Sequence, residues 1–261
     1  MTTNDFITEL FCPIDDLMKP LPKHPQANLY PSEIVTLGLL FALKGVGSRA
    51  FYRWLVRDCH ELFPHLPERT RLFRLLKTHW RWTYGFMAQP TLLGVIDTYG
   101  IELLHPIREG RSRAQFARQG LSNHRWIVGA KLGLLLNRFG LIVGWAWAPA
   151  NTHDQAFQPL IEAVADRMVV LGDTGFHAAA GDPPNLKVCR RGEWNTRMLV
   201  ETVLSMLNGV CHLKKVAHRV AAYFQARLAF TMAAFNVLAQ WYGLPADEEG
   251  FVRLSIAEFS L

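Results

Sequence analysis

Cysteine is scarce in this chain: there are four in 261 residues, and no two of them form a CxxC pair. Cysteines spaced this widely exclude a zinc ribbon and suggest no disulfide framework, so we expect free thiols in a reducing compartment. The ten histidines show no HExxH or HxxxH spacing, which argues against a zinc hydrolase. Ser112 and Ser205 lack a GxSxG elbow, and no GxxxxGKS or GxxxxGKT loop is present, so serine hydrolysis and ATP use are not indicated.

Long hydrophobic runs are lacking as well. Residues Met1–Lys19 show no basic start followed by an apolar block, so no secretory signal is predicted. The longest apolar runs are Ile34–Leu43, Leu141–Ala150 and Val220–Ala239. The first two are shorter than the ~20 residues that span a bilayer, and the third contains Gln225 and Arg227. We therefore expect a soluble, cytoplasmic protein with no membrane partner.

The remaining composition is that of a folded, mildly basic protein. Half of the residues are hydrophobic, enough for a sizeable core in one large domain or two small ones. The formal net charge is +6 and the isoelectric point is about 9.3, which weakly favours a polyanionic partner. Basic residues gather in three groups: Arg108, Arg111, Arg113, Arg118 and Arg125; Lys187, Arg190, Arg191 and Arg197; and Lys214, Lys215, His218 and Arg219. These groups are either solvated surface or a track for DNA.

Residues 1–85 are predicted to form a helical region after an irregular start, because four prolines before residue 26 argue against a helix there. A helix is predicted to begin at Pro31 and to end at Gly45 and Gly47. Two further helices are expected, one capped by Ser48 and one from about Glu68 to Trp80. Their outward basic residues are Arg69, Arg71, Arg74, Lys77 and Arg81. Two interpretations stay open: a helix-turn-helix-like DNA-binding module, or a plain helical bundle with a solvated basic face.

Residues 90–245 are predicted to form an α/β domain, with a C-terminal tail over 246–261. The expected strands are Leu92–Leu104 with an interruption after Asp97, Trp126–Asn137, Gly140–Ala148, Arg167–Leu171 and Asn185–Cys189. Helices are expected at His153–Ala165 and, as one or two long segments, over Trp194–Trp241. This order suits a mixed central sheet flanked by helices.

Three carboxylates stand out in this domain. Asp97 and Asp173 end two apolar, strand-like runs, and Glu201 lies in a helical stretch. A carboxylate directly after a buried strand is costly to desolvate unless its charge is compensated. Three that converge repel one another unless a cation lies between them, and Mg²⁺ with oxygen ligands is the natural candidate. Taken singly, each acid could equally be a turn former or a surface charge, so the prediction depends on their joint context.

That context contains several motifs. Val95-Ile96-Asp97-Thr98 and Gly172-Asp173-Thr174-Gly175-Phe176 each follow a strand, and Asn151-Thr152-His153-Asp154 follows the third strand. Trp194, Arg197 and Glu201 occupy the first three places of the spacing Tyr-x2-Arg-x3-Glu-x6-Lys. Together these motifs resemble the DDE site of bacterial insertion-sequence transposases, which have an RNase H-like catalytic fold.

The fourth place of the helix spacing holds Asn208 instead of lysine. Arg197 and Glu201 are four residues apart and share one helix face, so Arg197 can orient Glu201 or contact a phosphate. Asn208 can form hydrogen bonds but carries no charge, and Lys215 could substitute in part. The resemblance gives these candidates for DNA contact: Trp194, Arg197, Asn208, Arg190, Arg191, Lys214 and Lys215.

The resemblance also implies an activity, a cofactor and partners. Asp97, Asp173 and Glu201 would bind two Mg²⁺ ions, for which Mn²⁺ would be an acceptable substitute. Metal-activated water would cut the phosphodiester at the element end, and the freed 3′-hydroxyl would attack target DNA at the same centre. The expected partners are double-stranded DNA and a second copy of the chain, acting in the nucleoid.

Two alternatives stay open. The asparagine at 208 is also compatible with a decayed or domesticated transposase that binds DNA as a repressor. A nonspecific RNase H-like nuclease is the other alternative. Asp154 follows His153 and could be taken for a ligand pair with it, but we interpret this segment as a helix cap and helix start.

Overall fold

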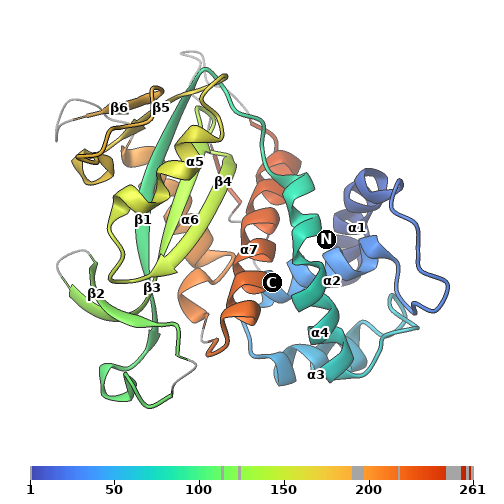
Figure 1. Cartoon of the computed structure of the whole chain (residues 1–261). Helices are drawn as coiled ribbons and strands as arrows, with labels where there is room; N and C mark the ends of the chain where they lie inside the picture. The colour runs from blue at the N-terminus through green and yellow to red at the C-terminus, as the bar shows by residue number, and fades with distance from the viewer. Residues whose placement is uncertain are drawn as a thin grey trace.

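The computed structural model describes residues 2–112, 115–122, 125–189, 197–216, 218–244, 254–256 and 259. The chain forms a mixed α/β structure in which a curled sheet lies on one side of a long helix, α7 (Ala221–Tyr242), as Figure 1 shows. Helices from the N-terminal part of the chain lie on the other side of α7. The prediction of a mixed sheet flanked by helices is confirmed.

The four N-terminal helices are α1 (Thr3–Met18), α2 (Pro31–Lys44), α3 (Ser48–Asp58) and α4 (Arg69–His79), followed by the 3₁₀ segment η1 (Trp80–Phe86). Of these helices, α2, α3 and α4 begin and end close to the predicted positions. Helix α2 starts at Pro31 and stops at Gly45, whose φ of 60° is the left-handed conformation that glycine adopts at little cost. The sequence signals therefore predict both the first residue and the end of α2 correctly.

The irregular start predicted for residues 1–30 is wrong for Thr3–Met18, which form the helix α1, and is confirmed for residues 19–30. Thr2 Oγ1 accepts a hydrogen bond from Asp5 N at 3.2 Å, and Asp5 Oδ2 accepts one from Thr2 N at 2.9 Å, so the helix begins with a capping box. Pro13 lies inside the helix at a cost of about 3 kcal/mol. The buried side chains of α1 are Phe6, Ile7, Leu10, Ile14 and Met18. At about 2 kcal/mol each, their burial outweighs the cost of the proline.

The sheet has six strands, with the order β2-β3-β1-β5-β6 and β4 pairing with β3. The strands are β1 (Leu93–Leu104), β2 (Arg118–Ser122), β3 (Arg125–Asn137), β4 (Ile142–Pro149), β5 (Val169–Gly172) and β6 (Leu186–Val188). Strand β3 is antiparallel to β1, β2 and β4, whereas β5 is parallel to both β1 and β6. The sheet thus joins an antiparallel meander to two parallel strands.

Two of the strand predictions need correction. Strand β1 is not interrupted at Asp97, because this residue pairs with Leu134 of β3 within a continuous ladder. Strand β2 was not predicted, since its sequence, Arg-Gln-Gly-Leu-Ser, lacks the apolar alternation of a strand. It forms through pairing with the start of β3.

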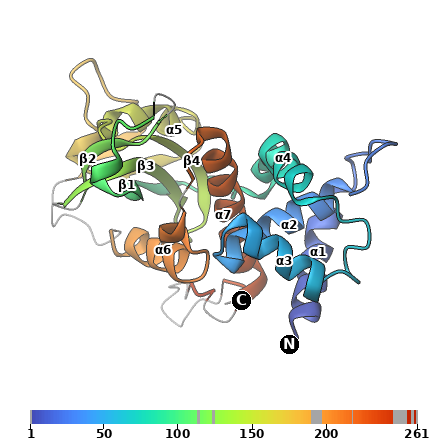
Figure 2. The ribbon, with the colours of Figure 1, turned by 90° about the horizontal axis from the view of Figure 1, so that it is seen from below.

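Helices cover both faces of the sheet, as Figure 2 shows for α5 (Gln158–Glu162) and α6 (Arg197–Gly209). The face toward α5 and the 3₁₀ segment η3 (Asp154–Phe157) packs in a small apolar cluster that includes Ile96 and Phe157. The face toward α6 and α7 belongs to the main core. The long helical segment predicted up to Trp241 is divided into α6 and α7, with the short 3₁₀ segment η5 (Leu213–Lys215) between them.

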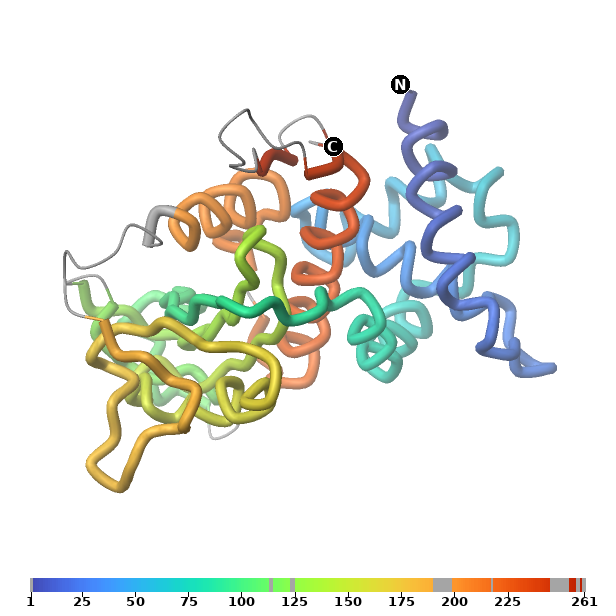
Figure 3. Tube along the Cα trace, turned by 90° about the horizontal axis from the view of Figure 1, so that it is seen from above, coloured from blue at the N-terminus to red at the C-terminus, as the bar shows by residue number. Residues whose placement is uncertain are grey.

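Helix α7 is buried on nearly all sides and joins the helical region to the sheet. Gly38 of α2 lies against the ring of Phe230, so the two helices approach closely, and Asn236 bonds to β4 through Ile142. One continuous core cluster contains residues of α1, α2, α7, β1 and β3. The division into 1–85 and 90–245 stays a prediction, and α7 packs against both parts (Figure 3).

Two further predictions concern the cysteines and the membrane. All four cysteines are free; Cys12 is exposed, while Cys59, Cys189 and Cys211 are buried. Within the described ranges, no single helix is both long and apolar enough to cross a membrane, and α2 with α3 meets that test only as a pair bent by 116°.

Candidate active site

Strands β1 and β5 bring Asp97 and Asp173 next to each other. The strands are parallel, with Val95 paired to Leu171, so each aspartate lies two residues beyond this pair on its own strand. Neighbouring strands are about 4.8 Å apart, and residues two apart point to the same face. Asp173 directly follows β5 in an extended conformation. The two carboxylates therefore leave adjacent strands on one face of the sheet.

That face is the one covered by α6. Val95 belongs to the main core together with Val200 of α6, whereas Ile96 packs in the cluster on the opposite face. A Cβ built on Gly172 would meet Ile96, so Gly172 faces the opposite side and its neighbour Asp173 faces α6. Helix α6 also carries the third predicted carboxylate.

Glu201 lies on α6, between residues that approach the hairpin beside the start of β1 and one residue that bonds to β1 itself. Its neighbours on α6, Leu199 and Val203, approach Gly140 in the hairpin beside the start of β1. Further along α6, the side-chain amide of Asn208 donates a hydrogen bond to Tyr99 Oη at 3.2 Å. Glu201 precedes Asn208 by two helical turns and shares its flank. The helix thus presents the exposed Glu201 on the flank that faces β1.

The three carboxylates are not gathered tightly. In the part of the chain that the structure describes, no three His, Cys, Asp or Glu side chains lie close enough to hold a metal ion. Asp97 and Asp173 fit Mg²⁺ by their oxygen donors and their common face. Glu201 lies on the helix that covers this face, but its place in a shared metal shell rests on the sequence resemblance.

A tight turn fixes the backbone around Asp173. Its Oδ1 accepts a hydrogen bond from Gly175 N at 2.9 Å, capping the 3₁₀ segment η4 (Thr174–Phe176). A Cβ at Gly175 would lie 2.9 Å from Asp154 Oδ2 and 3.0 Å from Asp173 Oδ1. Both distances are shorter than an ordinary van der Waals contact, so a side chain at position 175 would displace one or both carboxylates or the turn. Asp173 is therefore both a turn former and a candidate ligand.

Beneath this turn lies a polar network that the predicted motifs did not include. The interpretation of residues 151–154 as a helix cap and helix start is confirmed for the start, because η3 begins at Asp154 after His153, although His153 forms no side-chain cap bond. Asp154 Oδ1 accepts a hydrogen bond from Thr98 Oγ1 at 3.0 Å and lies 2.8 Å from Lys131 Nζ. The one signal in the sequence was Lys131 itself, a cation inside the apolar run of β3 that requires an acidic partner.

The predicted DNA-contact residues have varied placements. Arg190, Arg191 and Trp194 lie outside the described residues, and of Arg197 only its backbone at the start of α6 is described. The amide of Asn208 is turned toward β1, and its Oδ1 is buried without a hydrogen-bond partner among the described residues. Lys214 and Lys215 are exposed on η5. Their contact with DNA stays a prediction.

The basic residues of the helical region lie mostly outward. Arg71, Arg74 and Arg81 are exposed, whereas Arg69 and Lys77 are half-buried. A helix-turn-helix-like function of α2 to α4 stays a prediction.

Compared with models of known protein families and with curated protein sequences, the chain matches none of them.

Proposed function

We propose that this protein is a DDE transposase, with Asp97, Asp173 and Glu201 as its acidic triad. The observation that carries the proposal is the parallel register of β1 and β5, which brings two aspartates, distant in sequence, to the same face of one sheet. The third acid stands on the helix that covers this face. The motifs around each residue add the resemblance to transposases of insertion sequences.

The architecture of the sheet supports an RNase H-like catalytic fold. Strands β1, β3 and β4 form an antiparallel meander, and β5 and β6 continue the sheet in parallel on the free side of β1. In such a sheet, the carboxyl end of β5 lies beside the middle of the long first strand. That arrangement supplies a rigid support for carboxylates that must not move during the reaction.

Each residue has a defined task in the proposed reaction. Asp97 and Asp173 would hold the divalent cations, and Glu201 would complete the shell of one of them. Bound Mg²⁺ would supply the activation of water or a 3′-hydroxyl and the stabilisation of charge at phosphorus. Thr98 donates a hydrogen bond to Asp154, which ties the strand of Asp97 to η3, and the Asp154 carboxylate lies beside Gly175 in the turn after Asp173.

The partners follow from the reaction. Cutting and joining require double-stranded DNA at the element end and at the target. Two ends must be held together during transposition, so we propose a dimer in the active complex. The +6 net charge is in accord with a DNA partner.

The test is cleavage of labelled element-end DNA by the purified protein with Mg²⁺. Asp97→Asn, Asp173→Asn and Glu201→Gln should each lower the cleavage rate at least ~100-fold while leaving DNA binding within a few fold. Glu162→Gln is the matched control, because Glu162 is exposed on α5 at the opposite face of the sheet. Full activity in the three triad variants would falsify the assignment, and equal cleavage of unrelated duplexes or RNA–DNA hybrids would favour a nonspecific nuclease.

A decayed transposase that only binds DNA is the second candidate. Two observations favour it: Asn208 replaces the lysine of the helix spacing, and the described residues contain no gathered group of three metal ligands. The same assay separates the candidates. Specific binding of element ends without metal-dependent cleavage, in wild type as well as in Asp97→Asn, would select the second.

A further inference from the structure

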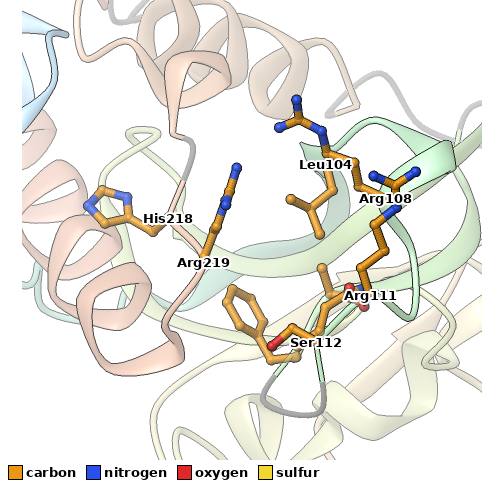
Figure 4. A pocket seen from close by; sticks show the side chains of 9 residues that line it. Leu104, Arg108, Arg111, Ser112, His218 and Arg219 are labelled. Atoms are coloured by element: carbon orange, nitrogen blue, oxygen red, sulfur yellow. Dashed lines mark hydrogen bonds between the residues drawn. The ribbon is translucent and has the colours of Figure 1, made fainter.

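A cavity of about 490 Å³ opens beyond the end of β1, between two segments that are far apart in sequence. One wall comes from residues 104–112 and 115–117, and the other from His218 and Arg219 before α7. The lining residues are Leu104, Arg108, Arg111, Ser112, Gln115, Phe116, Ala117, His218 and Arg219. Figure 4 shows Arg219 and His218 on one side, facing Arg108 and Arg111 on the other. The fold therefore gathers three arginines that the sequence keeps apart.

These arginines have no acidic partner among the described residues. Glu102, at the end of β1, forms its ion pair with Arg125 at 2.5 Å. Glu109 Oε1 accepts a hydrogen bond from the backbone N of Gln119 at 2.9 Å. Both acids of this region thus have other partners. Three cations around one cavity, uncompensated within the described part of the chain, favour a bound anion.

The floor of the cavity is aromatic and firmly held. The ring of Phe116 packs edge-on against Trp147, with centroids 5.1 Å apart, and lies 5.2 Å from Phe224 of α7. Trp147 in turn donates a hydrogen bond to Gln225. A fixed ring beside a cluster of arginines offers two surfaces at once: a stacking platform for a base and donors for a phosphate.

His218 adds a polar group without adding charge. Burial, with a further contribution from the nearby Arg227, lowers the pKa of His218 to about 4, so the imidazole is neutral at pH 7. Its Nδ1 is buried and has no hydrogen-bond partner within the described part of the chain. The charge of the cavity is therefore that of its arginines.

The cavity and the candidate active site lie along the same strand, β1. Leu104 follows Asp97 by seven residues on β1, which corresponds to about 23 Å of extended strand. Segment η5, with the exposed Lys214 and Lys215, contacts β1 and precedes Arg219 in the chain. At ~3.4 Å per nucleotide of B-form DNA, this distance corresponds to about seven nucleotides.

We propose that this cavity binds one nucleotide unit of a DNA strand, with its phosphate against Arg108, Arg111 and Arg219 and its base against Phe116. The position along β1 places this unit about seven nucleotides away from the cleaved phosphodiester. That second statement rests on the proposed function, whereas binding of the nucleotide unit does not.

The experiment measures binding of a labelled 20-nucleotide single strand to the full chain in EDTA, so that no cleavage occurs. Arg108→Gln/Arg111→Gln and Arg219→Gln should weaken binding about 10-fold to 100-fold and reduce the salt slope by about 0.7 for each phosphate that is no longer neutralised. Arg167→Gln is the matched control, because Arg167 is exposed at the opposite end of β1 and pairs only with its neighbour Asp166. The control should stay within twofold of wild type.

A second comparison tests the base. Phe116→Leu keeps an apolar side chain on the floor and should weaken binding of an ordinary strand about fivefold, with no effect on an abasic strand. Strands with a 5′-phosphate and with a 5′-hydroxyl distinguish two sources of the anion. If the arginine variants weaken binding of the 5′-phosphorylated strand alone, the cavity binds the end of a strand. If they weaken binding of both strands equally, the cavity binds an internal phosphodiester.

Two results would overturn the proposal: a weakening in the double arginine variant no larger than in Arg167→Gln, or equal weakening for abasic and ordinary strands with Phe116→Leu. Failure of the transposase assignment has a different signature. In that case cleavage is insensitive to Asp97→Asn, while the strand-binding measurements in EDTA are unaffected.

Discussion

Lys131 and Asp154 form a half-buried ion pair, with Nζ of the lysine 2.8 Å from Oδ1 of the aspartate. The pair joins β3 to η3 directly beneath the turn that carries Asp173. The same carboxylate accepts a hydrogen bond from Thr98, the residue after Asp97. The Asp154 side chain thus lies close to both candidate aspartates, although it is not a candidate ligand: it bonds to the residue after Asp97 and lies beside Gly175, two residues after Asp173.

Removing the acid of this pair should destabilise the protein. Asp154→Ala leaves Lys131, whose side chain is only 15% exposed, without its partner, and should cost about 2 kcal/mol of unfolding free energy, between the values for surface and buried pairs. Urea unfolding measures the difference. Asp16→Ala, in the exposed pair of Asp16 with Lys19, is the control and should lower the unfolding free energy much less, because solvent screens that pair. Equal losses of stability in the two variants would contradict a structural role for the pair.

A methyl group at position 175 should damage the site more than the fold. In Gly175→Ala the new Cβ would meet Asp154 Oδ2 and Asp173 Oδ1 at 3.0 Å or less, so the two carboxylates or the turn must shift. We expect a loss of at least ~10-fold in metal-dependent cleavage, with a melting temperature lowered by only a few degrees. Gly209→Ala serves as the control, because nothing lies within 4 Å of a Cβ there. Unchanged cleavage in Gly175→Ala would show that the turn tolerates movement.

Asn236 should be essential for joining α7 to the sheet. Its Oδ1 accepts a hydrogen bond from Ile142 N at 2.9 Å, and its Nδ2 donates to the carbonyl oxygens of Ile142 and Phe86. Asn236→Leu removes all three hydrogen bonds, although the Ile142 carbonyl keeps its bond from Ala88 N, and should cost about 3 kcal/mol in urea unfolding. Thr231→Val, on the same helix, removes only a bond to the carbonyl of Arg227 and should cost less than about 1 kcal/mol. A similar cost in both variants would sink this assignment.

His218 should make stability depend on pH below neutrality. Its folded-state pKa is lowered to about 4 by burial and by Arg227, so between pH 6.5 and 4 the unfolded chain binds a proton that the folded chain does not. The contribution of His218 to the free energy of unfolding is therefore fully present above pH 6.5. It is lost as the pH falls toward 4, by about 3 kcal/mol in total.

The measurement is urea unfolding at several values between about pH 5 and 7, a range in which most carboxylates remain ionised. His218→Gln should flatten the dependence relative to wild type. Superimposable pH profiles for the two proteins would mean that His218 is protonated without cost in the folded state.

Local patterns in the sequence predicted most of the elements. The start of α2 at Pro31 and its end at Gly45 carry their own signals, and the apolar runs before Asp97 and Asp173 identify β1 and β5. Such features depend on residues within one or two turns or along one strand, so they can be recognised without the fold. The failures share a cause too: α1 tolerates Pro13 because of distant packing, and β2 forms only against β3.

The sequence by itself determined that two acids, Asp97 and Asp173, end strand-like apolar runs. It also determined that a third acid, Glu201, lies in a helical stretch and that all three stand in recognisable motifs. Only the tertiary structure decided how these parts relate. It placed Asp97 and Asp173 on one face through strand register, gave Asp154 its partner Lys131, turned Asn208 toward Tyr99, and surrounded a cavity with arginines from two distant segments. Register, ion pairing and cavity formation depend on contacts between residues tens of positions apart, and no local pattern of residue types specifies them.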